Sequence, residues 1–177
     1  MIKIGKMKKT LLLLLFTMGS IASYAQQLER VNTQKPELLD AKNGFRNHNF
    51  GESLSSFEGL ELFEDGGDVK MYGRESENRI VGDCELFSIH YFFYKGKFCS
   101  VELEAWDDKN PSNSKELLNE LRKAYGIETA RKGNNLTWFG DKVILGYKLK
   151  PSTSTTTCVV TFYSKIYQPK VDNPSGL

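Results

Sequence analysis

The chain of 177 residues has 24 Lys and Arg against 22 Asp and Glu, and its first 25 residues hold four of the lysines and no acid. The other 152 residues are therefore close to neutral, which gives no electrostatic footprint for nucleic acid or an anionic lipid surface. Their number suits one domain with a core of its own.

The first 25 residues have the pattern of a secretory signal peptide. Lys8 and Lys9 precede the short apolar run 11–16, and small residues follow as far as Ala25. The run is too short to span a bilayer, and no cysteine follows it to accept a lipid anchor. We expect a mature protein that begins near Gln26, carries no membrane anchor, and works in the periplasm or outside the cell.

Composition divides the rest of the chain into three parts. Residues 26–42 are polar and form a lead-in segment, with one helical turn expected at 36–41 because Pro36 suits a helix start. A single α+β domain is expected over 43–167, its ordered part starting near Asn43. Residues 168–177 contain two prolines and few apolar side chains, which predicts a flexible tail.

The first elements of the domain are expected to be short. The sequence predicts a short helix over residues 53–58 that ends at Gly59. Strands are expected at 60–63 and 69–72, because these apolar runs flank the turn formers Asp65, Gly66 and Gly67.

Residues 85–106 give the clearest strand signal, two runs of alternating apolar and polar residues around Gly96. A two-residue turn at Lys95 and Gly96 would mix the core and solvent faces, whereas a three-residue loop pairs Tyr91 with Cys99 and keeps the faces apart. This hairpin is expected at the centre of the sheet. The preferred register predicts a core face made of Phe87, Ile89, Tyr91, Phe93, Cys99, Val101, Leu103 and Ala105.

The best helix follows at 113–125. Asn113 can cap it with Glu116 reaching back, and Gly126 ends it. Further strands are expected at 136–139, 142–149 and 156–167. We therefore predict an α+β fold, an antiparallel sheet of about six or seven strands with the 113–125 helix packed on one face.

Several motifs resemble those of an uncharacterised family of small secreted bacterial proteins. The likeness covers roughly residues 43–166 and implies a single secreted domain, but no known activity, cofactor or catalytic residue. Its motifs are a Phe-Arg and Phe-Gly-x-x-Leu opening at Phe45-Arg46 and Phe50-Gly51, and a hairpin at Tyr91-x-Phe93-Tyr94-x-Gly96-Lys97.

Aromatic residues on the outer face of the hairpin predict a contact surface. We assign to this surface Phe92 and Phe98, together with His90 and Glu102. An alternative is that the N-terminal helix or the tail covers this side.

The same face also carries serine, histidine and glutamate residues, the residue types that a hydrolase site uses. The expected register places His90 opposite Ser100, and Ser88 opposite Glu102. The simpler interpretation is a polar, solvated strand face, because neither Ser88 nor Ser100 lies at a strained turn beside an oxyanion hole.

The odd cysteine count leaves two alternatives for Cys84, Cys99 and Cys158. An exported protein could form one disulfide and keep one free thiol, or all three could be buried as small apolar side chains. No Cys-x-x-Cys motif occurs and only His48 and His90 could assist, so we expect no metal site. No phosphate-binding glycine loop occurs either, and we expect no cofactor.

The residues favour a non-enzymatic binding module of the bacterial envelope or medium, such as an inhibitor or assembly factor. Its partner would be an envelope or extracellular protein, and the sequence does not name the ligand. The alternative is a small secreted hydrolase that uses Ser88 or Ser100 with His90 and Glu102. A third hypothesis is a stress-related protein with a redox-active cysteine pair.

Overall fold

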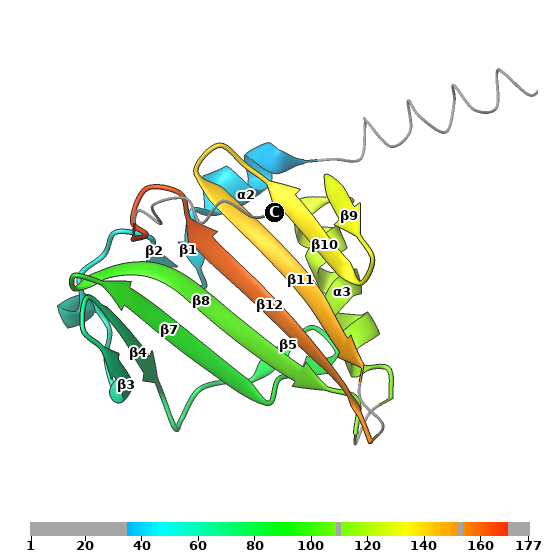
Figure 1. The fold of residues 1–177 in the computed structure, drawn as a ribbon, viewed down its shortest axis with the longest axis horizontal. Coiled ribbons are helices and arrows are strands. Elements are labelled where there is room, and N and C mark those ends of the chain that lie inside the picture. The colour runs from blue at the N-terminus through cyan, green and yellow to red at the C-terminus, as the bar shows by residue number, and fades with distance from the viewer. Residues whose placement is uncertain (1–34, 109–110, 152–153, 170–177) are drawn as a thin grey trace, which may run out of the picture. The chain divides into compact units, whose positions relative to one another are not determined.

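A computed structural model describes residues 35–108, 111–151 and 154–169. Their main element is an antiparallel sheet of eight strands in the order β3-β4-β7-β8-β12-β11-β10-β9 (Figure 1). The strands are β3 (Glu61–Gly66), β4 (Val69–Gly73), β7 (Ser88–Tyr94), β8 (Lys97–Trp106), β9 (Ala130–Lys132), β10 (Asn135–Phe139), β11 (Val143–Pro151) and β12 (Thr156–Ser164).

The remaining elements are short strand pairs and helices. Strand β1 (Gly44–Phe45) pairs with β2 (His48–Asn49), and β5 (Ile80–Val81) pairs with β6 (Cys84–Glu85). The helices are α2 (Pro36–Lys42), the short 3-10 helix η1 (Leu54–Ser56) and α3 (Asn113–Tyr125).

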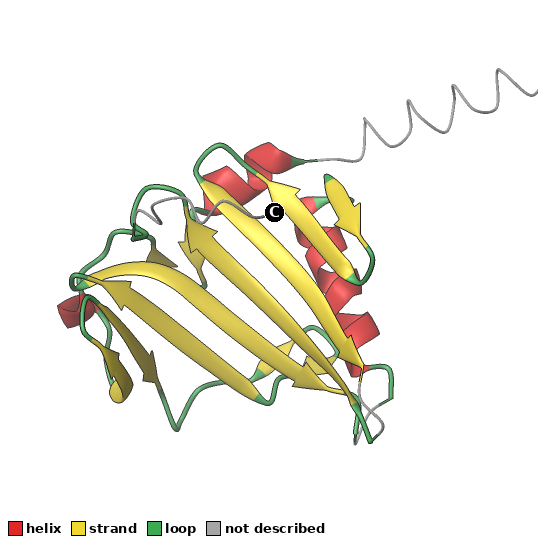
Figure 2. Ribbon diagram, viewed as in Figure 1, coloured by secondary structure: helices red, strands yellow, loops and turns green. Residues whose placement is uncertain are grey.

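One face of the sheet carries the core. Helix α3 contacts β8 and β12, and α2 contacts α3 and β11, so both helices lie on the same side of the strands (Figure 2). Burial alternates along β7, β8, β11 and β12, as expected where one face of each strand is covered. The inward side chains include Tyr91, Val101, Leu103, Leu145, Tyr147, Val160 and Phe162.

The predicted antiparallel sheet is confirmed, but the structure is mostly β and fits the predicted α+β class only loosely. The sheet has eight strands, two helices pack on it, and the expected helix at 53–58 is only one 3-10 turn. Helix α2 belongs to the core, because Leu39 is 1% exposed. The fold therefore includes residues that we expected in the lead-in segment before Asn43.

The turn of the central hairpin differs from the prediction. Tyr94 pairs with Lys97, so the turn has the two residues that we rejected. Lys95 and Gly96 have φ angles of 49° and 76°, the left-handed pair that a two-residue hairpin turn requires. A glycine at the second position accommodates this conformation without strain.

A β-bulge then restores the alternation that this turn would have disrupted. Phe93 pairs with Phe98 and Phe92 pairs with Ser100, which leaves Cys99 as the extra residue. Phe98 and Cys99 are consequently both buried in succession. The predicted outward position of Phe98 was wrong, because alternation alone cannot reveal a bulge.

The bulge also changes the partners on the outer face. His90 lies opposite Glu102 and Ser88 lies opposite Glu104, in place of the expected Ser100 and Glu102. Phe87 precedes β7 and is 50% exposed, so its predicted core position was wrong. Its ring stacks on Trp106 instead, with 3.8 Å between the ring centroids.

Helix α3 spans the predicted residues, but its N-terminus is stabilised differently. The Asn113 amide is buried, where its oxygen accepts from the Glu85 N–H at 2.9 Å and its nitrogen donates to the Glu85 carbonyl at 2.6 Å. Asp107, at the end of β8, accepts from the Ser114 N–H and hydroxyl, both at 2.7 Å. A carboxylate outside the helix thus takes the capping role that we gave to Asn113.

Candidate functional site

The outer face of the sheet is covered by none of the described helices. Strand register places Phe92 beside Met71 on β4 and Ser100 on β8. Ser100 lies beside Tyr163 on β12, which in turn lies beside Ile144 on β11. These five residues form a transverse row across five strands, apolar except for Ser100. We call it the outer row.

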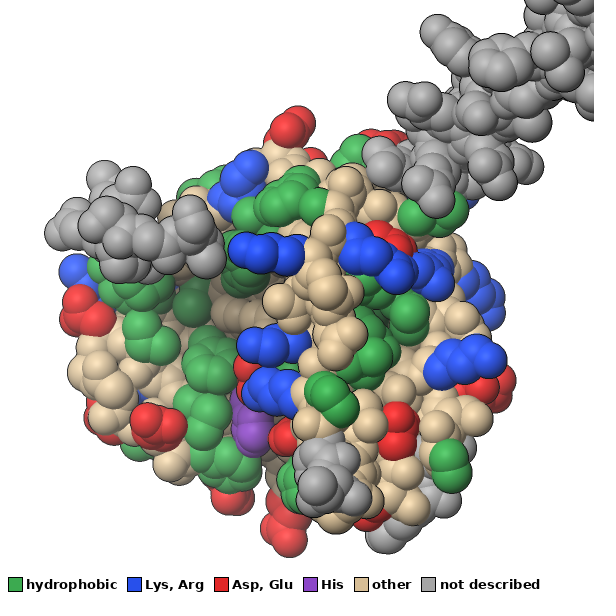
Figure 3. Space-filling model, turned by 45° about the vertical axis from the view of Figure 1, so that its right-hand side comes forward, with side chains coloured by type: hydrophobic (Ala, Val, Ile, Leu, Met, Phe, Trp, Pro, Cys, Tyr) green, Lys and Arg blue, Asp and Glu red, His purple; other side chains and the backbone are tan. Residues whose placement is uncertain are grey.

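A groove of about 610 Å³ lies over four residues of the outer row, Phe92, Ser100, Tyr163 and Ile144. In Figure 3 this face is hollowed between one wall rich in hydrophobic side chains and another that carries Lys and Arg, with histidine and acidic side chains between them. Its apolar lining includes Val69, Phe92, Ile144 and Tyr163, and its charged side chains are Glu102 and Lys165. We call it the outer groove.

The charged groups of the outer groove are available for a ligand. No hydrogen bond or ion pair of the Glu102 carboxylate is found among residues 35–108, 111–151 and 154–169. The Lys165 ammonium donates only to the Gly140 carbonyl, at 3.2 Å, which leaves its charge uncompensated within this part of the chain. Burial raises the pKa of Tyr163, so its phenol stays protonated at neutral pH.

The Ser100 hydroxyl and the Cys99 thiol in the groove already form hydrogen bonds. Ser100 Oγ donates to the Phe162 carbonyl at 2.9 Å. Cys99 Sγ donates to the Phe92 carbonyl at 3.3 Å, and burial raises its pKa to about 11. Neither group is activated as a nucleophile, because a nucleophile needs a nearby base or a lowered pKa.

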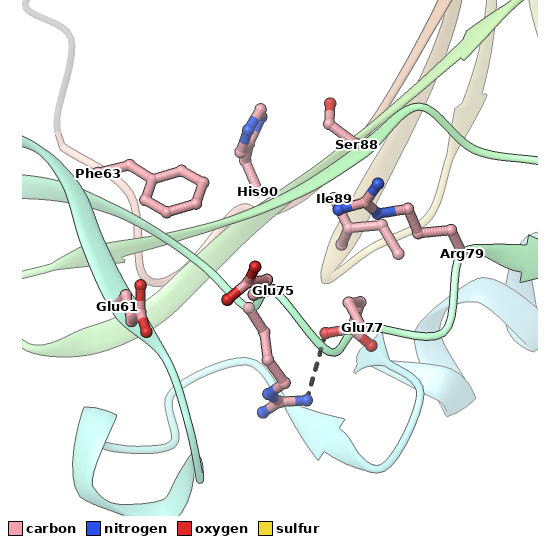
Figure 4. Close-up of a pocket in the computed structure, with 9 residues that line it drawn as sticks. Glu61, Phe63, Glu75, Glu77, Arg79, Ser88, Ile89 and His90 are labelled. Carbon is pink, nitrogen blue, oxygen red and sulfur yellow. Dashed lines mark hydrogen bonds and ion pairs between the residues drawn. The ribbon is translucent and has the colours of Figure 1, made fainter.

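A smaller pocket of about 240 Å³ adjoins β7 (Figure 4). His90 and Ser88 project to one side of this strand, while Ile89 and Glu77 lie on the other. The His90 ring contacts Phe63 edge-on, with centroids 5.9 Å apart.

Buried Glu77 has a structural role beside this pocket. It accepts a hydrogen bond from the Tyr91 hydroxyl at 2.9 Å and forms ion pairs with Arg74, at 3.2 Å, and with Arg46. Three donors satisfy the carboxylate and connect the segment after β4 to the β1–β2 turn. A carboxylate held in this way is poorly suited to proton transfer.

The proposed serine nucleophiles do not meet the histidine. Ser88 Oγ donates to Glu104 at 3.4 Å, and Trp106 donates to the same carboxylate at 2.9 Å. No hydrogen bond between His90 and either serine is found in the described ranges. The geometry therefore gives the hydrolase hypothesis no support.

The structure assigns different places to the four predicted contact residues. Phe92 and Glu102 line the outer groove, and His90 lines the adjoining pocket. Phe98 is 0% exposed and packs against Phe50 and Phe57, so it cannot contact a partner. The sequence analysis missed Val69, Ile144 and Lys165, because their place beside Phe92 depends on pairing between distant strands.

The cysteines and other metal-ligating residues form no second site. Cys84, Cys99 and Cys158 are free and buried. The structure therefore agrees with three buried thiols and not with one disulfide and a free thiol. Within the described ranges, no group of three His, Cys, Asp or Glu side chains could hold a metal ion.

The expected signal peptide lies outside the described residues. None of the helices that the structure describes is long and apolar enough to cross a membrane. Comparison with models of protein families, with curated proteins and with solved structures finds no match to this chain.

Proposed function

We propose that this chain is a non-enzymatic binding module whose contact site is the outer groove. The observation that carries the proposal is an apolar groove of about 610 Å³ on a sheet face that no described helix covers. Ligand sites are typically of this size, mostly apolar, and contain a few polar groups that fix orientation. Phe92 and Tyr163 supply the aromatic surface, and Glu102 and Lys165 supply the charges.

Binding without turnover agrees with the chemistry of the groove. The Ser100 hydroxyl and the Cys99 thiol both donate to backbone carbonyls, and among the described residues His90 in the adjoining pocket has no serine partner. The leader-like first 25 residues support a place of action in the periplasm or outside the cell, with an envelope or extracellular partner. Membership of the secreted family stays a prediction that rests on the motifs alone.

A fluorescent probe tests whether the outer groove binds apolar ligands. Gly146 lies opposite Thr161, and a Cβ atom there would meet nothing within 4 Å. Thr161 lines the groove, so Gly146→Gln adds a side chain beside this lining, with no clash at its Cβ atom. The matched control is Thr137→Gln, which adds the same side chain one strand further out, opposite Gly146.

We expect anilinonaphthalene sulfonate to bind the native protein at one site. Gly146→Gln should weaken binding by about fivefold or more, and Thr137→Gln should leave it unchanged. Equal binding by all three proteins would place the probe elsewhere and contradict the proposal. Turnover of a nitrophenyl ester that disappears in His90→Ala would instead establish the hydrolase.

A further inference from the structure

We propose that the outer groove takes a short apolar peptide with both termini free, about four residues long. Its amino terminus would lie at Glu102 and its carboxylate at Lys165. The inference rests on the proposed function, because it names the ligand class of the same groove.

The two ends of the groove carry opposite charges. Glu102 lies opposite Thr161 on β12, and Lys165 comes four residues after Thr161, directly after the end of β12 at Ser164. At about 3.3 Å per residue, the backbone positions of the two residues are about 13 Å apart along the strand direction. The carboxylate is unpaired and the ammonium is bound only to the Gly140 carbonyl among the described residues.

The backbone separation of Glu102 and Lys165 sets the length of the ligand. An extended chain spans about 3.3–3.6 Å per residue, so four residues cover about 13–14 Å. A dipeptide spans only about 7 Å, about half of this backbone separation, and a longer peptide would carry one terminus beyond the groove. Four residues therefore let both termini pair with protein charges at once.

The middle of the groove suits apolar side chains. Phe92, Tyr163 and Ile144 lie in one row between the charged ends, and Val69 also lines the groove. The Ser100 hydroxyl donates a hydrogen bond to the Phe162 carbonyl, but its oxygen can still accept one from a peptide N–H. The groove is open on one side, so water satisfies the other backbone groups of the ligand.

The pair of charges argues against other elongated ligands. A fatty acid could pair with Lys165, but its chain would remove water from the Glu102 carboxylate without giving it a partner. A polyamine could pair with Glu102 but would place a second ammonium beside Lys165. A zwitterion satisfies both ends.

Terminal capping of the probe peptide Ala-Phe-Val-Ala tests the inference. Its affinity is measured by calorimetry and by displacement of anilinonaphthalene sulfonate. We expect N-acetylation to weaken binding at least about fivefold in the native protein but not in Glu102→Gln. C-amidation should have the same effect in the native protein but not in Lys165→Met.

Neighbouring charges on the same face provide matched controls. Glu104→Gln and Lys148→Met alter charged side chains in the next row, outside the groove. In both variants, N-acetylation and C-amidation of the peptide should weaken binding as much as in the native protein. A series from two to six residues should bind best at four.

The outcomes separate this inference from the proposed function. Caps that weaken binding equally in Glu102→Gln and in the native protein would overturn the assignment of the termini. If the dye binds the groove but the peptide does not displace it, the peptide inference is wrong and the proposed function still stands. Dye binding that Gly146→Gln leaves unchanged would overturn both proposals.

Discussion

Two phenylalanines near one turn have opposite environments because of a single extra residue. Phe92 lies on the outer row, whereas the bulge at Cys99 turns Phe98 into the core. Phe98 there contacts the rings of Phe50, Phe57 and Phe93. At the residue scale, the site thus depends on where a bulge places each ring.

Alanine substitutions should separate the two roles. Phe98→Ala should lower the free energy of unfolding by about 3–5 kcal/mol, because it removes a fully buried ring and leaves a cavity. Phe92→Ala should cost about 1 kcal/mol or less but weaken probe binding in the groove. Urea unfolding and dye titration of both variants measure this. Equal losses of stability would contradict the assigned faces.

The thiols make a second prediction at the residue scale. Burial raises the pKa of Cys99 to about 11 and those of Cys84 and Cys158 to about 12. Because only the thiolate reacts readily, the native protein should label slowly with a disulfide reagent near pH 8. After unfolding without reductant, all three cysteines of the chain should label. A single reactive thiol would reveal a disulfide and contradict the three free thiols of the structure.

At the scale of elements, one carboxylate attaches α2 to the sheet. Asp40 accepts from the backbone N–H groups of Asp141, Lys142 and Val143 at 2.6, 2.8 and 3.1 Å, at the turn before β11. Burial alone would raise its pKa, but these hydrogen bonds outweigh it and lower the pKa below the usual 3.8. Residues a hundred positions apart are thereby joined.

The attachment of α2 should depend on pH. A carboxyl whose pKa falls on folding stabilises the protein above its unfolded pKa, and this stability is lost as the pH falls through the folded pKa. Asp40→Asn should therefore lower the free energy of unfolding by about 1 kcal/mol near neutral pH. The gap to the native protein should close below pH 3.8. Asp141→Asn, a change in the neighbouring turn, is the control and should show neither effect.

In the described part of the chain, helices cover one face of the sheet and none covers the other, and sequence pattern predicts this only in part. Alternation in 85–106 and the apolar stripe of 113–125 correctly indicated the central hairpin and the main helix. The pairing of β8 with β12 is non-local, so no pattern within either strand places Tyr163 beside Ser100. The outer groove is created by that pairing, which is why the site residues predicted in its lining, Phe92, Ser100 and Glu102, all belong to the hairpin.

Nuclear magnetic resonance mapping of the amides during titration with anilinonaphthalene sulfonate tests the central claim most directly. The account predicts that the largest shift changes lie on the outer row, at Phe92, Ser100, Tyr163 and Ile144. Thr137→Gln should preserve them and Gly146→Gln should remove them. Changes centred on α3, or on the pocket around Glu77, would contradict the assignment of the outer groove as the binding site.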